Sequence, residues 1–313
     1  MRCSAMRSNL IRTELLSHRF RGFDSRDATV AGLRAALSAG VRHVECDIRQ
    51  TLDRRLVIHH DSHFRADDGE WYGIGQWRYE DVRQQKSMRG LALLDEIVAE
   101  FRTQSAPETR LHLDVKMTGG ERDIFGCVQA AGVLDKTIFV SWMAKALMNL
   151  HAMAPQVPLC FSHISLHRYP GCYWLARAMR SDWLIPRLAR LIAPIDPRLS
   201  AQWRSGRVLF HDNGDPLDGA DADNDDGESQ SDIVPHAVTG ALRDALTASK
   251  GYVCLPRLSA CAELTTDYRS AAIKIAVYAA KSKIDVDTII AQSSPDLIYV
   301  DNAALFGADA ARV

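Results

Sequence analysis

The chain has 313 residues, of which 47% are hydrophobic and 25% are charged. This length allows either one large α/β barrel or two domains of ordinary size. With only 11 Pro and 19 Gly, the composition excludes collagen-like, wholly disordered and small disulfide-rich proteins. Lys and Arg total 38 against 39 Asp and Glu, a formal net charge of −1. No global positive field is present to hold a polyanion, so nucleic-acid binding is not expected.

The seven cysteines are scattered and form no CxxC spacing, so we expect reduced thiols and no zinc or redox site built from cysteine. The first residues are basic but lack the apolar run and cleavage site of a secretory signal. No run of 18 apolar residues occurs in the sequence. We therefore expect a cytoplasmic protein.

Short apolar, β-branched runs alternate with stretches of helix-like hydrophobic spacing along most of the chain. The predicted strands are 14–19, 41–49, 56–60, 110–116, 137–142, 157–163, 251–256, 273–279 and 296–301. The predicted helices are 28–39, 91–101, 124–131, 144–153 and 267–272. If 56–60 continues the second strand or follows it in a hairpin, about eight parallel strands remain, which is the number that closes a (β/α)8 TIM barrel. An open, doubly wound sheet is the alternative, but no GxGxxG follows the first strand.

Residues 164–250 depart from this rhythm, and we interpret them as a long insertion after the fifth strand of a single barrel domain, 1–313. The first part, 164–206, is amphipathic, with Trp and Leu among arginines, and we expect it to cap the barrel mouth. Transient contact of 168–198 with a membrane surface is an alternative. The tract 212–232 is polar and acidic, and we expect it to be flexible. It is not a calcium loop, because Asp226 stands where such a loop requires glycine.

Two predicted strands carry charged residues on one face. Along HVECDIRQ (43–50), Glu45 and Asp47 share a face with a histidine and an arginine, because side chains alternate along a strand. In LHLDVK (111–116), Asp114 and Lys116 share a face in the same way. Carboxylates are costly to bury in a parallel strand unless a cation or buried partners compensate. Pairing with arginines at a barrel rim is the purely structural alternative.

Glu45, Asp47 and Asp114 offer hard oxygen ligands, which suit one divalent cation, either Mg²⁺ or Ca²⁺. Histidines suited to proton transfer lie at His18, where the first strand ends, and at His59 and His60 after the second. These positions fall at the carboxyl ends of strands, the face on which such barrels place catalytic groups. Arg19 and Lys116 add positive charge where a phosphate could bind.

These residues resemble the glycerophosphodiester phosphodiesterase family of the phospholipase-C-like barrel superfamily. Its pattern is a His-Arg near the start, a helix, Glu-x-Asp, Thr-x-Asp and a hydrophobic run ending in His-Asp. The chain matches it with His18-Arg19, Glu45-x-Asp47, Thr51-x-Asp53 and His60-Asp61, in that order and with similar spacing. The family's His-Arg-Gly is His18-Arg19-Phe20 here. Weaker similarity continues to the end of the chain outside 164–250.

The resemblance implies a metal-dependent phosphodiesterase for a small glycerophosphodiester-like substrate. His18 and His60 would divide the general acid and base work, by direct hydrolysis or through a cyclic phosphate. The implied cation ligands are Glu45, Asp47 and Asp114, and the implied substrate-binding residues are Arg19, Lys116 and Trp142.

Alternative substrates come from the same superfamily. Asp114 with Lys116 also resembles the sphingomyelinase D and phospholipase D branch, which would imply a lysophospholipid or sphingomyelin. The long insertion would instead suit an unusual head group, such as the sugar phosphodiesters that the related agrocinopine-processing enzymes handle. An inactive barrel that serves as a binding protein is the remaining alternative.

Overall fold

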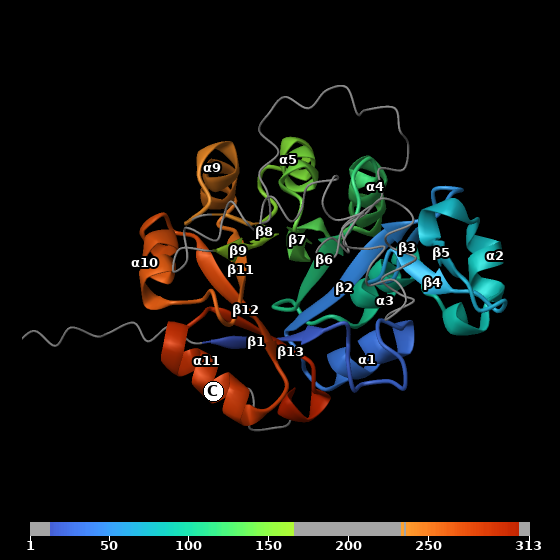
Figure 1. The fold of residues 1–313 in the computed structure, drawn as a ribbon, viewed down its shortest axis with the longest axis horizontal. Helices are drawn as coiled ribbons and strands as arrows, with labels where there is room; N and C mark the ends of the chain where they lie inside the picture. The colour runs from blue at the N-terminus through green and yellow to red at the C-terminus, as the bar shows by residue number, and fades with distance from the viewer. Residues whose placement is uncertain (1–12, 166–232, 235, 307–313) are drawn as a thin grey trace, which may run out of the picture.

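The computed structural model describes residues 13–165, 233–234 and 236–306. Eight parallel strands form its centre: β1 (Glu14–His18), β2 (His43–Gln50), β6 (Arg110–Val115), β7 (Thr137–Ser141), β8 (Leu159–Ser162), β11 (Tyr252–Pro256), β12 (Lys274–Ala280) and β13 (Leu297–Val300). Strand β1 pairs with both β13 and β2, so the ring is closed, as Figure 1 shows. The predicted TIM barrel is therefore confirmed, and the open sheet is excluded.

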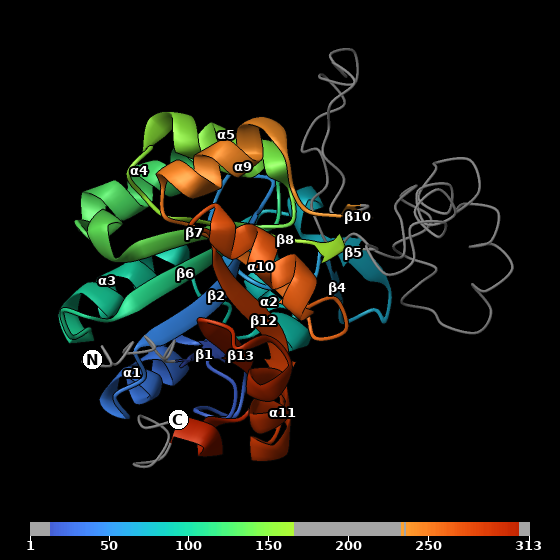
Figure 2. The same ribbon diagram turned by 90° about the vertical axis from the view of Figure 1, so that its left-hand side faces the viewer.

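Helices surround the barrel and follow one another around its outside (Figures 1 and 2). They are α1 (Val30–Ser38), α3 (Leu94–Gln104), α4 (Glu121–Ala131), α5 (Ala144–Met153), α9 (Gly240–Ala248), α10 (Ala262–Ser270) and α11 (Lys283–Ser293). Thr29 begins α1, because its hydroxyl accepts a hydrogen bond from the Gly32 amide. None of the described helices is long and apolar enough to span a bilayer.

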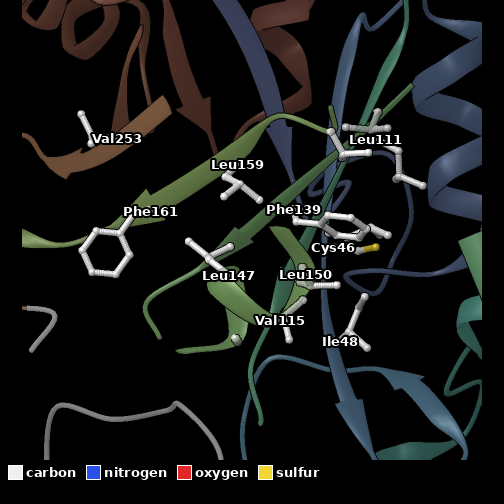
Figure 3. Packing of buried hydrophobic residues seen from close by; sticks show 14 of the residues in the cluster. Cys46, Ile48, Leu111, Val115, Phe139, Leu147, Leu150, Leu159, Phe161 and Val253 are labelled. Carbon is white, nitrogen blue, oxygen red and sulfur yellow. The ribbon is translucent and has the colours of Figure 1, made fainter. Parts of the chain in front are cut away.

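The main hydrophobic core lies between the outer face of the barrel and these helices. Alternate residues of each strand point outward. Figure 3 shows Val115, Phe139 and Leu159 near Leu147 and Leu150 of α5. Cys46 and Ile48 of β2 belong to this outer set, and both are fully buried. Because the outward residues fill this layer, the remaining residues of each strand must face the barrel interior.

The barrel interior has two halves, an apolar one formed by six strands and a polar one along β2 and β6. Residues from six strands form a separate apolar cluster there: Leu16, Ile138, Val140, Cys160, Tyr252, Cys254, Ala276, Leu297 and Tyr299. The interior positions of β2 and β6 are polar instead, among them Glu45, Asp47 and Asp114. The predicted charged face therefore points into the barrel.

Between β2 and α3 the chain forms additional short strands and one helix outside the eight-stranded barrel. Strand β3 (Leu56–Ile58) pairs antiparallel with the end of β2, so the run at 56–60 is a hairpin strand. A second hairpin, β4 (His63–Arg65) with β5 (Trp71–Gly73), and helix α2 (Tyr79–Gln84) follow it. Short 3₁₀ turns are η1 (Ile74–Gln76), η2 (Lys86–Met88), η3 (Leu134–Lys136) and η4 (Ala303–Phe306).

The two ends of the insertion lie together at the carboxyl end of β8. There β9 (Ile164–Ser165) pairs in parallel with β10 (Ile233–Val234). Helix α9 lies within the predicted insertion, 164–250. It follows β10 and precedes β11, so it is the barrel helix between β8 and β11. Residues 166–232, with most of the predicted cap, the proposed membrane-contact segment and the acidic tract, lie outside the described part of the chain.

Candidate active site

Three carboxylates converge at the carboxyl end of the barrel. Glu45 and Asp47 lie on β2, and Asp114 on β6 is the register partner of Asp47. One oxygen from each lies within 4.8 Å of the others, and all three residues are buried. The closed barrel explains this convergence, because inward positions of neighbouring parallel strands lie side by side.

Two cations lie against these carboxylates. The Lys116 Nζ atom is 2.7 Å from Asp114 Oδ2 and 3.2 Å from Asp47 Oδ1. The Arg19 Nε atom is 3.0 Å from Asp47 Oδ2, and the Arg19 backbone N–H donates to Glu45 Oε2 at 3.2 Å. The cluster therefore contains three acidic groups and two basic ones within a buried space.

Burial and mutual repulsion set the protonation of the carboxylates. Burial raises the pKa of Glu45 well above its usual range, and the charges of Asp47 and Asp114 raise it further. For Asp47, burial also raises the pKa, but Lys116, His60, Arg19 and His18 together outweigh it and lower that pKa. Glu45 therefore holds a proton more readily than Asp47 does.

His18 ends β1 beside this cluster. Its Nε2 atom is 3.8 Å from Glu45 Oε2, and its Nδ1 atom is 2.7 Å from Asp301 Oδ1. Burial lowers the pKa of His18, although the hydrogen bond to Asp301 opposes that shift. The Nη1 atom of Arg21 reaches the same Asp301 oxygen at 2.7 Å. His18 is therefore held at one ring nitrogen while the other faces the carboxylates.

The second predicted histidine follows β3. His60 Nδ1 lies 2.7 Å from Asp61 Oδ1, and this bond lowers the pKa of Asp61 to about 2. The neighbouring His59 is half-buried, and burial lowers its pKa to about 4. His59 is therefore neutral at pH 7, whereas His60 has the carboxylate partner that orients an imidazole.

A left-handed turn after β1 positions Arg19. Arg19 and Phe20 have φ values of 57° and 55°, which residues with a Cβ rarely adopt. The turn brings the Arg19 amide to Glu45 and sends the Phe20 ring into the core, where it is fully buried. Burial of the ring offsets the backbone strain of this turn.

Trp142 follows the strand next to the one that carries Asp114, because β7 pairs with β6. It directly follows β7, at an inward position above Val140. Its ring makes an edge contact with Tyr278 near the end of β12, with ring centroids 5.6 Å apart. The two rings therefore form an aromatic wall on the apolar side of the barrel mouth.

Two polar residues of the site were not predicted from the sequence. Asp301 follows β13, the last strand, and its place at a strand end is the signal that could have revealed it. Arg49 was noted only as sharing the charged face of β2, yet its guanidinium bonds to the backbone of His60 and Lys116. No pattern in the sequence indicates bonds to backbone carbonyls.

The donor set fits a hard divalent cation. All three side chains offer oxygen, the ligand that Mg²⁺ and Ca²⁺ prefer. Within the described residues, both oxygens of Asp47 and Asp114 Oδ1 are buried without an aligned hydrogen-bond donor. Asp47 has ion pairs with Lys116 and Arg19, but an oxygen such as Asp114 Oδ1 is costly to leave unsatisfied, so the cluster is suited to a cation.

Comparisons with known proteins agree with this arrangement. Residues 17–165 match the model of the Glycerophosphoryl diester phosphodiesterase family. A Silicibacter pomeroyi structure, provisionally named a glycerophosphoryl diester phosphodiesterase, is 15% identical, with TM-score 0.61 over 94% of this chain and 91% of its own. A glycerophosphodiester phosphodiesterase from Agrobacterium tumefaciens is 15% identical, with TM-score 0.56 over 94% and 99%.

A third structure is an Oleispira antarctica phosphodiesterase in complex with the product sn-glycerol-3-phosphate. It is 14% identical, with TM-score 0.55 over 92% of each chain. The comparison with curated proteins gave no match. At these identities the structural likenesses establish the fold, and the family match covers the segment that carries His18, Glu45, Asp47, His60 and Asp114. Residues 17–165 are therefore similar to the glycerophosphodiester phosphodiesterase family.

Proposed function

We propose that this protein is a metal-dependent phosphodiesterase that hydrolyses a glycerophosphodiester-like substrate with His18 and His60 as acid and base. The observation that carries the proposal is the buried convergence of Glu45, Asp47 and Asp114 beside two cations at the carboxyl end of the barrel. Acidic, basic and imidazole groups gathered on this face supply what phosphodiester hydrolysis requires.

The three carboxylates would hold one divalent cation, Mg²⁺ or Ca²⁺. When bound, such a cation stabilises negative charge on phosphoryl oxygens. Arg19 and Lys116 lie beside the same carboxylates, so their side chains would bind the remaining phosphoryl oxygens. The polar half of the barrel interior would thus bind the phosphate end of the substrate.

The two histidines would move the protons. One accepts the proton of the attacking hydroxyl, whose oxygen forms a bond to phosphorus while the bond from phosphorus to the leaving oxygen breaks. The other donates a proton to that leaving oxygen. An attacking hydroxyl from the substrate itself gives a cyclic phosphate, and attack by water gives an open product. His18 is oriented by Asp301 and His60 by Asp61, which suits both to directional proton transfer.

Trp142 would bind the part of the substrate beyond the phosphate. Its ring and that of Tyr278 lie on the apolar side of the mouth, where an alcohol group could pack. The substrate would be small, which is in keeping with the glycerol phosphate product bound by the Oleispira antarctica protein.

The test is metal-dependent turnover. Protein freed of metal with EDTA is assayed with glycerophosphodiesters, lysophospholipids, sphingomyelin and sugar phosphodiesters, with Mg²⁺ or Ca²⁺ added back. ³¹P NMR then distinguishes cyclic from open products. We expect turnover of a glycerophosphodiester that requires the added cation. Turnover of only a lysophospholipid, sphingomyelin or a sugar phosphodiester would move the assignment to those branches. No turnover of any substrate would leave a binding protein.

A further inference from the structure

Arg49 is a buried cation that donates hydrogen bonds to two backbone oxygens of the candidate active site. It is 4% exposed. Its Nε and Nη2 atoms donate to the carbonyl oxygen of His60 at 2.9 and 2.7 Å. Its Nη1 atom donates to the carbonyl oxygen of Lys116 at 3.2 Å. One side chain is therefore bonded to the backbone of a candidate acid–base residue and of a candidate phosphate-binding residue.

The two carbonyls belong to different segments. His60 follows β3, which pairs with one edge of β2, and Lys116 follows β6, which pairs with the other. Arg49 lies on β2 between them, so its guanidinium spans the strand and joins the segments on both sides. The last β2–β3 register pair is Ile48 with Ile58, and the last backbone bond from this segment to β2 is from the His59 amide to the Asp47 carbonyl, so at His60 the Arg49 guanidinium takes over the contact with β2.

The chemistry of this contact requires arginine. A guanidinium has five N–H donors in a fixed plane, so it can bond two carbonyls in different directions at once. Lysine has the same charge on a flexible stem, without this planar geometry. A buried charge costs more than a well-packed apolar residue of similar volume, so packing alone does not account for arginine here.

We propose that Arg49 is a positioning residue, which sets the separation between the His60 imidazole and the Lys116 ammonium by holding both backbones. The proposal rests on the proposed function of the same site. Lys116 is fixed at its other end by Asp114 and Asp47, and His60 by Asp61. Loss of the guanidinium would release the carbonyl groups of both residues, while the Lys116 amide stays bonded to Ile48 and the side-chain contacts remain possible.

The test compares Arg49→Lys and Arg49→Met with wild type, and uses Arg55→Met as a matched control. Arg55 lies in the same hairpin, is exposed, and lies 3.9 Å from its acidic partner Asp95. We expect kcat to fall roughly 10²-fold in Arg49→Met, the scale of an approximately 1 Å misplacement, with KM within a few-fold of wild type. Arg49→Lys should fall nearly as far, because it keeps the charge but not the geometry.

A readout independent of turnover separates this proposal from the proposed function. The ¹⁵N-edited NMR signals of the His60 ring, assigned with a His60→Ala variant, should broaden or split in both Arg49 variants and stay sharp in Arg55→Met. Wild-type kcat in Arg49→Lys would overturn the proposal, as would an unchanged His60 signal. If Arg49→Met does not fold, the lysine variant decides. If wild type turns over no phosphodiester, the proposed function fails, and the NMR result still tests the positioning role.

Discussion

The two halves of the barrel interior have the same backbone but opposite chemistry. On β2 and β6, inward positions hold Glu45, Asp47 and Asp114 above a buried pair, His43 and His112, whose ring nitrogens lie 3.0 Å apart. On the strands from β7 to β12, the inward positions are apolar or nearly so: Ile138, Val140, Cys160, Cys254 and Ala276. These polar side chains follow two adjacent strands, and His18 of β1 and Asp301 after β13 extend the polar side at the barrel mouth.

This division separates the groups that stabilise the barrel from those that suit chemistry. Apolar residues of one half stabilise the fold because they are removed from water, by about 25 cal/mol per Å² of buried apolar surface. The carboxylates of the other half are desolvated and repel one another, which raises the pKa of Glu45 well above its usual range. Substitutions in the polar half should therefore change activity more than stability, and substitutions in the apolar half should do the reverse.

The largest effect is expected from Glu45→Gln. The change removes one ligand charge and should lower turnover at least roughly 10²-fold, since a cation contributes several kcal/mol to the transition state. It also relieves repulsion from Asp47 and Asp114, so the melting temperature should stay the same or rise. Metal titrations followed by turnover and by calorimetry measure both effects. Glu100→Gln, which alters a surface ion pair with Arg34, should change neither. Unchanged metal affinity in Glu45→Gln would contradict the ligand assignment.

The next effect is expected from the histidines. His18→Ala and His60→Ala should each lower kcat roughly 10²-fold or more, the scale for loss of a general acid or base. Melting temperatures should change little, because both side chains lie at the barrel mouth. His59→Ala is the control, since His59 follows β3 in the same segment but is neutral, with a pKa of about 4. Equal impairment of His59→Ala and His60→Ala would show that the wrong histidine was assigned.

Much of this architecture could be predicted from the sequence, because alternation along a strand is a local property. The charged face of HVECDIRQ and the predicted strand at 110–116 correspond to β2 and β6 in the barrel. Helix α9 could also have been predicted, since Leu242, Ala245 and Leu246 have helical spacing and are buried. It was not predicted because residues 164–250, which include the polar tract before this helix, were all assigned to the insertion.

Other features depend on tertiary contacts and give no local signal. Strands β4 and β5 have three residues each, and they are stabilised by a small core of their own that includes Phe64, Ile74 and Val82. Asp301 becomes part of the site only because β13 lies beside β1 in the closed ring. The Arg49 contacts are with carbonyl oxygens, which every residue possesses, so no side-chain pattern distinguishes their partners.

A smaller effect on activity, with a clear effect on stability, is expected in the apolar half. Leu297 on β13 is 1% exposed and lies inside the barrel. Leu297→Ala leaves a cavity and should lower the free energy of unfolding by about 2–5 kcal/mol, while kcat changes less than twofold. Urea unfolding and turnover of the same preparation measure the two quantities. Ile284→Ala is the control, because that side chain is 78% exposed and should change neither. A large fall in kcat would show that the two halves are mechanically coupled.

The smallest effect concerns a buried histidine outside the barrel interior. His163 is fully buried after β8, and burial lowers its pKa to about 4. The Tyr268 hydroxyl accepts a hydrogen bond from the Val238 amide at 2.8 Å, so its own proton is directed to His163 Nε2, also at 2.8 Å. That bond requires an unprotonated nitrogen, so the fold holds His163 in its neutral form.

Acid should therefore destabilise the fold through this residue. In the unfolded chain His163 takes up a proton near pH 6.5, whereas in the folded protein it does so near pH 4. The stability that neutral His163 contributes is present above pH 6.5 and is lost as the pH falls from 6.5 to 4, by up to about 3 kcal/mol. His163→Phe cannot take up this proton, so its urea midpoint should fall less between pH 7 and pH 4.5 than that of wild type. His236→Gln, at an exposed position, should behave like wild type. Parallel losses in His163→Phe and wild type would assign the acid sensitivity to the carboxylate half instead.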